Sequence, residues 1–73
     1  MHGAITSMTD IGRVVAARRR QLGYTQTQMA IELGLTQRYV SELENGKTSS
    51  LNTRTLDVLD QLGIELGFKV RDD

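Results

Sequence analysis

The side chains best suited to specific recognition fall in one short stretch of the 73-residue chain, around Gln37 and Arg38. Val40 and Leu43 follow at helical spacing, so they turn toward a core. The opposite face then carries Gln37, Arg38 and Ser41. A glutamine amide pairs with adenine through two hydrogen bonds and an arginine fork does so with guanine, each worth about 1–3 kcal/mol of discrimination. We expect these three residues to read base edges of DNA; a phosphate contact or plain solvation is the alternative for each.

Other kinds of chemistry have little support in the composition. The chain has no cysteine and a single histidine, His2, so we expect no disulfide, no metal site and no cofactor. One core built from 38% hydrophobic residues leaves little room for a catalytic pocket, which argues against an enzyme. No apolar run approaches the roughly 20 residues of a membrane span, and no signal peptide pattern is present. We expect no membrane partner, and a cytoplasmic location with the nucleoid.

The formal net charge is zero, but its distribution is uneven. Positions 12–55 contain seven basic and three acidic residues, and positions 56–73 contain two basic and five acidic residues. A basic first part and an acidic last part suggest two surfaces with different partners. A mixed, solvated surface is the alternative, and charge alone does not decide between them.

Cap residues and glycines divide the chain into four predicted helices. The predicted N-terminal caps are Ser7, Thr25, Thr36 and a residue near Asn52. The helices end close to Gly23, Gly34, Gly46 and Gly63. The apolar residues at helical spacing within them are Ile11, Val14, Val15, Leu22, Met29, Ala30, Leu33, Val40, Leu43, Leu56, Leu59 and Leu62.

The second and third of these helices are joined tightly. Gly34 permits the positive φ that a short helix–helix turn needs, and the small Ala30 lets the two helices cross closely. This is the helix-turn-helix arrangement, whose second helix lies in the major groove of DNA. We therefore assign residues 7–63 to an all-α DNA-binding domain and residues 1–6 to a flexible N-terminal tail.

The period changes after Gly63, where apolar residues alternate as in a β-strand. The alternating set is Ile64, Leu66, Phe68 and Val70. No other segment reads as a strand, so we expect two copies of the chain to pair their strands antiparallel in a homodimer. Gly67, in the middle of the run, would allow a close approach there. Residues 64–73 are thus interpreted as a dimerisation strand with an acidic tail, the alternative being a frayed end.

Phosphate contacts are expected from the helix N-termini, where backbone amides and the helix dipole favour an anion. Thr25 and Gln26 at the second helix and Thr36 at the third carry suitable side-chain donors. In a dimer the two recognition helices need a separation of about 34 Å to meet successive major grooves, which implies a palindromic operator.

The stretch from Thr25 to Lys47 resembles the phage-repressor (Xre/Cro) family of helix-turn-helix domains. The matching residues are Thr25-Gln26, Met29-Ala30, Gly34-Leu35, Val40-Ser41 and Leu43-Glu44-Asn45-Gly46-Lys47. The resemblance runs from about Ser7 to Leu62 and implies a lambda-repressor-like fold of four helices. It also implies phosphate contacts from Asn45 and Lys47, and an ion pair of Arg19 with Glu44 that ties the first helix to the recognition helix.

The short fourth helix followed by the sequence IELGFKV is similar to antitoxins of the HipB type. Those proteins dimerise through such a strand and bind a kinase-like toxin, so the resemblance implies a repressor of its own operon with a toxin partner. A stand-alone Xre-family regulator, or a protein-interaction module on the same scaffold, are the alternatives.

Four further residues have less definite predictions. We expect Arg18 and Arg20 to be solvated, because three consecutive arginines point in different directions on a helix. Tyr39 is expected to pack over the first helix rather than to stack along the DNA backbone. Glu42 is open between accepting a hydrogen bond from a cytosine amino group and being held away from the phosphates.

Overall fold

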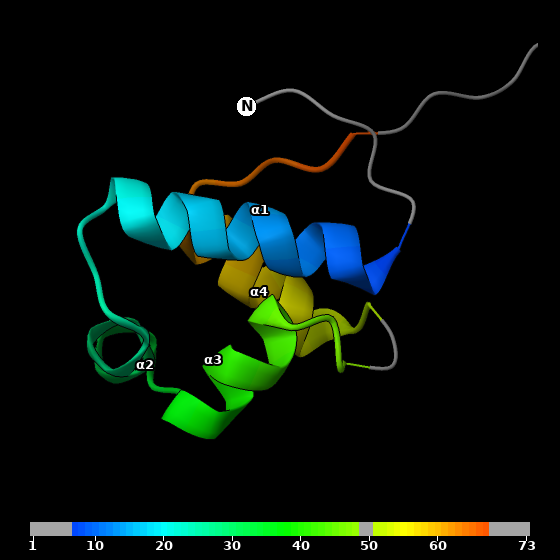
Figure 1. The fold of residues 1–73 in the computed structure, drawn as a ribbon. Coiled ribbons are helices and arrows are strands. Elements are labelled where there is room, and N and C mark those ends of the chain that lie inside the picture. Colours follow the sequence, from blue (N-terminus) through cyan, green and yellow to red (C-terminus); the bar gives the residue numbers. More distant parts are fainter. Residues whose placement is uncertain (1–6, 49–50, 68–73) are drawn as a thin grey trace, which may run out of the picture.

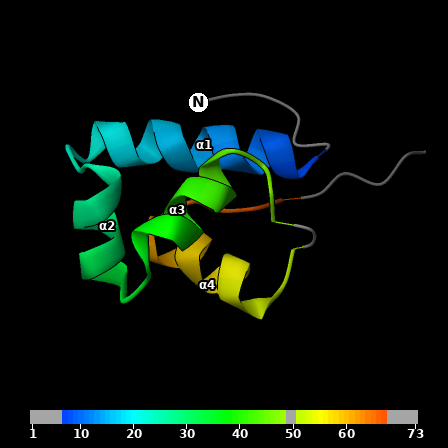
Figure 2. The same cartoon turned by 60° about the horizontal axis from the view of Figure 1, so that its bottom comes forward.

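The computed structural model describes residues 7–48 and 51–67 of the chain. It contains four helices: α1 (Met8–Gln21), α2 (Gln26–Leu33), α3 (Gln37–Glu44) and α4 (Thr53–Gln61) (Figure 1). The predicted all-α, four-helix fold is confirmed. Turning the molecule brings α3 to the centre, with α1 running across the top, α2 at the left and α4 below and to the right (Figure 2).

The predicted cap residues all accept a hydrogen bond from the third residue of their helix. Ser7, Thr25, Thr36 and Asn52 accept from the backbone N–H of Asp10, Gln28, Tyr39 and Thr55, over 3.0–3.3 Å. At Thr25 the cap is reciprocal, since its N–H donates to the side chain of Gln28 over 2.8 Å. The Thr-x-x-Gln spacing is a sequence signal for such a capping box, and our sequence analysis missed it.

One cluster of buried side chains joins the four helices. Its members are Ile11, Val15, Met29, Ala30, Val40, Leu43, Val58, Leu59 and Leu62. Ala30 is 3% exposed, and Gly34 has φ 68°, so the predicted close crossing and tight turn are both confirmed. The cluster fixes α3 from its inner side and leaves its outer side free.

Two of the apolar residues at helical spacing do not face the core, since Leu22 is 42% and Leu56 45% exposed. The inward stripe of α4 instead starts at Thr55, which is fully buried, and continues through Val58. Leu56 lies about 100° around the helix from Thr55, which turns it outward. Leu22 is the C-cap of α1, one residue beyond the end of the helix, and its side chain is exposed there.

Arg18 was predicted to be solvated, but it is not. Its Nε donates to the carbonyl oxygen of Leu62 over 2.7 Å. The last carbonyls of a helix have no partner within the helix, and an arginine from another element can satisfy them. Arg18 therefore ties α1 to the C-terminal end of α4, whereas Arg20 is exposed as predicted.

The predicted C-terminal strand is not confirmed. Residues 64–67 form no strand in the isolated chain, and Phe68 and Val70 lie outside the described residues. Ile64 packs against the core cluster, while Leu66 is 39% exposed. The Ile64 side chain thus has the predicted inward orientation, but the ladder partner would have to come from a second chain.

Two kinds of feature are not found in the described part of the chain. None of its helices is long and apolar enough to cross a membrane. Residues 7–48 and 51–67 also contain no group of three or more side chains able to hold a metal ion.

Candidate nucleic-acid interface

The outer side of α3 carries the predicted base-reading residues. Val40 and Leu43 are fully buried, and this anchors α3 so that Gln37 and Arg38 are exposed and Ser41 is half-buried. Gln37 and Arg38 occupy the first turn of the helix, the part of a recognition helix that reaches base edges. Their contact with DNA stays a prediction, but the geometry it requires is present.

Behind this face, Arg19 of α1 and Glu44 of α3 form a buried ion pair. Arg19 Nε lies 2.7 Å from Glu44 Oε2, and Nη2 donates to Oε1 over 3.0 Å. The two side chains are only 12% and 5% exposed, and Arg19 also donates to the carbonyl of Tyr24 over 2.9 Å. Hydrogen bonding to Glu44 raises the pKa of Arg19, burial opposes this rise, and the carboxylate charge adds to it. The structure therefore brings together the two residues whose pairing the family resemblance implied.

Gln26 extends this pair to the base-reading face. Its Nε2 donates to Glu44 Oε1 over 3.2 Å, and its Oε1 accepts from Gln37 Nε2 over 2.9 Å. A carboxylate is an acceptor only, so Glu44 requires the amide of Gln26 to present its nitrogen inward and its oxygen to Gln37. Gln37 is left with its own side-chain carbonyl oxygen and one N–H. The oxygen can accept from the N6 amino group of adenine, and the N–H can donate to adenine N7.

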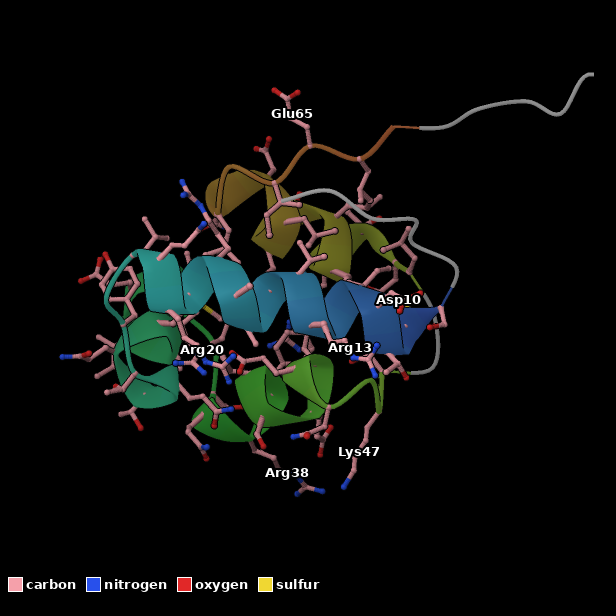
Figure 3. The ribbon with its side chains drawn as sticks, turned by 45° about the horizontal axis from the view of Figure 1, so that its top comes forward. Asp10, Arg13, Arg20, Arg38, Lys47 and Glu65 are labelled. Atoms are coloured by element: carbon pink, nitrogen blue, oxygen red, sulfur yellow. The ribbon has the colours of Figure 1, made fainter. Side chains whose placement is uncertain are left out.

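The predicted phosphate-contacting residues surround the same face. Thr25 and Thr36 serve as caps through their side-chain oxygens, and Asn45 Nδ2 donates to the carbonyl of Ser41 over 2.8 Å. Lys47 is exposed, and its amino group has no partner within the described residues. Figure 3 shows Lys47 pointing to the same side as Arg38, with Glu65 on the opposite side of the molecule. Arg38 and Lys47 thus lie on the side of the molecule away from Glu65, whereas Asp10 lies beside Arg13.

Glu42, which the sequence left open, pairs with Arg38. Arg38 Nε donates to Glu42 Oε1 over 2.9 Å, one helical turn away. Acid–base pairs at this spacing are a known source of helix stabilisation, so the sequence contained the signal. Arg38, the arginine predicted to read bases, is therefore already paired with an acid in the free chain.

A contact between α3 and α4 was not predicted. The Arg54 guanidinium carbon lies 4.0 Å from the centroid of the Tyr39 ring, and the Tyr39 hydroxyl lies 3.4 Å from Thr55 Oγ1. Tyr39 packs against the core cluster, but its polar and cationic partners come from α4 and not from α1, which it was predicted to cover. Such contacts join residues that are distant in sequence, so spacing gives no signal for them.

Comparison with known proteins agrees with this architecture. A family model described as "Helix-turn-helix" (HTH_3) matches residues 15–67. HipB in the HipA–HipB–O2–O3 complex has a TM-score of 0.77 and 24% identity, over 97% of this chain and 100% of that one. HipB in an O1–O2 complex has a TM-score of 0.77 and 25% identity, over 94% and 100%. Fe(II)-HppE with the alternative substrate (S)-1-HPP has a TM-score of 0.71 and 27% identity, over 84% of this chain but 32% of that one. No curated protein matches the chain significantly.

Proposed function

The chain belongs to the helix-turn-helix family, and on this premise we propose that it is a sequence-specific transcriptional repressor that acts as the antitoxin of a HipBA-like pair. The observation that carries the proposal is the chain of hydrogen bonds from Glu44 through Gln26 to Gln37. It orients the exposed amide of Gln37 before DNA is bound. Pre-orientation of this kind lowers the entropy cost of recognition, which favours a base reader over a solvated side chain.

In this proposal α3 enters the major groove with Gln37, Arg38 and Ser41 at base edges. Phosphate contacts fix the register without reading sequence. Their proposed sources are Thr25, Gln26, Thr36, Asn45 and Lys47. The solved structures most relevant to this docking are those of HipB in complex with its O1–O2 and O4 ligands, whose fold this chain shares.

We further propose that the protein is a homodimer that binds a palindromic operator. Leu56 and Leu66 are exposed, and they line one hollow together with Leu59 and Ile64. A second copy of the C-terminal segment would cover these apolar side chains and supply the strand partner that a single chain lacks. Two recognition helices related by the dimer axis would then meet two half-sites.

The proposed protein partner is a kinase-like toxin. The support is the fold similarity to HipB, which occurs in a complex with HipA, and the acidic bias of positions 56–73. The chain would silence this toxin and, together with it, repress the operon that encodes both. Without a toxin, the proposed DNA-binding face of α3 would serve a stand-alone regulator.

The experiment combines operator binding with partner capture. We expect the chain to bind a duplex from upstream of its own gene, and Gln37→Ala to lose the part of its preference over random duplex that an adenine in each half-site contributes. We also expect a tagged chain to capture one kinase-sized protein from its own cells in near-stoichiometric amount despite added nuclease. Binding without such a partner would leave a stand-alone repressor, and no preference for any duplex would contradict the DNA-binding proposal.

A further inference from the structure

Glu42 is an acidic side chain on the face that should approach phosphates, and the proposed function gives it no role. It contacts Arg38 over 2.9 Å, and the two side chains are 43% and 88% exposed. Within the described residues, the terminal nitrogens of Arg38 have no partner. The Glu42 carboxylate therefore contacts a single nitrogen, Nε of Arg38.

We propose that Glu42 is a positioning residue that gives Arg38 its specificity. It holds the guanidinium for a guanine edge and keeps it from acting as a general phosphate contact. The proposal rests on the proposed function, because it concerns the face that α3 presents to DNA.

The geometry of the pair supports the positioning role. Since Glu42 accepts from Nε, only the Nη1–Nη2 edge of Arg38 remains for a ligand. Two parallel N–H groups match the O6 and N7 acceptors of guanine in the major groove. An arginine loses much rotamer freedom when it is fixed, and here part of that entropy is lost before DNA arrives.

The charge of the pair supports the proposal that Glu42 keeps Arg38 from acting as a general phosphate contact. A guanidinium beside a carboxylate is neutral as a unit, so Arg38 adds little to the attraction for a phosphate backbone of any sequence. At a wrong base pair the two charges lose water and the fork finds no acceptor, which penalises that sequence. Specificity is the difference between the affinity for the correct sequence and the affinity for other sequences. Glu42 enlarges this difference by lowering the affinity for other sequences.

The first test measures how affinity for a random-sequence duplex falls with salt. Glu42→Gln keeps an acceptor for Nε but removes the charge, and Glu42→Ala removes both. We expect each to steepen the slope of log K against log salt by about 0.9, the value for one more neutralised phosphate. Glu32→Gln is the matched control, because Glu32 is an exposed acid on α2 with no basic partner in the described part of the chain. An unchanged slope in the Glu42 variants, or an equal change in Glu32→Gln, would overturn the proposal.

The second test selects binding sites from random duplexes. The wild-type chain should enrich a guanine in each half-site, and Glu42→Ala should lose at least about fivefold of that preference while other positions keep theirs. Arg38→Ala should lose the same position, and the double variant no more than Arg38→Ala alone. Equal guanine preference in Glu42→Ala would overturn the inference, whereas a wild-type chain that enriches no motif would overturn the proposed function itself. Unchanged thermal melting of the variants confirms that the fold is intact.

Discussion

At the residue scale, the side chains proposed to read DNA have orientations that are fixed from inside the molecule. Glu44 is 5% exposed and accepts hydrogen bonds from both Arg19 and Gln26, so one buried carboxylate serves the fold and the base-reading face together. Arg19 contributes its stability below the ordinary pKa of arginine and loses it only as pH rises through the raised folded value. The pair is therefore insensitive to pH near neutrality on the arginine side.

Loss of Arg19 should damage the fold more than it damages recognition. Arg19→Ala leaves the Glu44 carboxylate buried without its charge partner, which costs about 3–5 kcal/mol in the free energy of unfolding. For a domain of this size the melting temperature should fall by roughly 12 °C or more. Arg20→Ala is the control. Arg20 is the next residue in the chain and its side chain is exposed, so its loss should change the free energy of unfolding by less than about 0.5 kcal/mol. Equal melting of the two variants would mean that the ion pair contributes nothing.

At the element scale, the local signals were sufficient to predict the helices but not the contacts between them. The caps at Thr25 and Thr36 and the turn at Gly34 depend on a few neighbouring residues, and all were predicted from sequence. The bond from Arg18 to the end of α4 spans 44 residues, so no local pattern contains it. The Arg54–Tyr39 contact escaped prediction for the same reason. In the site, the members were predicted individually, whereas the link through Gln26 depends on how three helices meet.

α1 approaches α3 closely at Gly12, a residue that was not singled out from the sequence. A Cβ there would overlap the carbonyl oxygens of Leu43 and Glu44, the latter at 2.6 Å. Replacing a glycine within a helix by alanine normally raises the free energy of unfolding by about 0.5–1 kcal/mol. Here we expect the opposite sign.

Gly12→Ala should push α1 away from α3 and destabilise the domain, by about 1–3 kcal/mol if the packing relaxes in the usual way. Chemical denaturation measures the change in the free energy of unfolding. Because α3 carries the recognition residues, affinity for the operator should fall as well. A variant more stable than the wild type would show that the two helices do not approach this closely.

At the scale of the whole molecule, the described domain exposes two kinds of surface. Arg38 and Lys47 point to one side and Glu65 to the other (Figure 3). The second side also carries the hollow between α4 and residues 64–66, with its exposed leucines. This division suits a dimer that binds DNA on one side and protein on the other.

The proposed dimer can be tested at Leu66, which is 39% exposed in the single chain. Leu66→Asp should convert the dimer to a monomer, because a carboxylate would have to be buried in the strand pairing. Sedimentation would show the mass, and affinity for a palindromic operator should fall toward that for a single half-site. Leu51→Asp is the matched control, since Leu51 is 44% exposed but does not line the hollow. A dimeric Leu66→Asp protein would place the interface elsewhere.

Site selection from random duplexes shows whether the first turn of α3 reads DNA sequence, as proposed. The wild-type chain should enrich a palindrome whose half-sites are about 10 base pairs apart, and Gln37→Ala should lose an adenine from each half-site while keeping its fold and its affinity for random duplex. Enrichment of an unchanged motif by Gln37→Ala, or of no motif by the wild-type chain, would contradict the account.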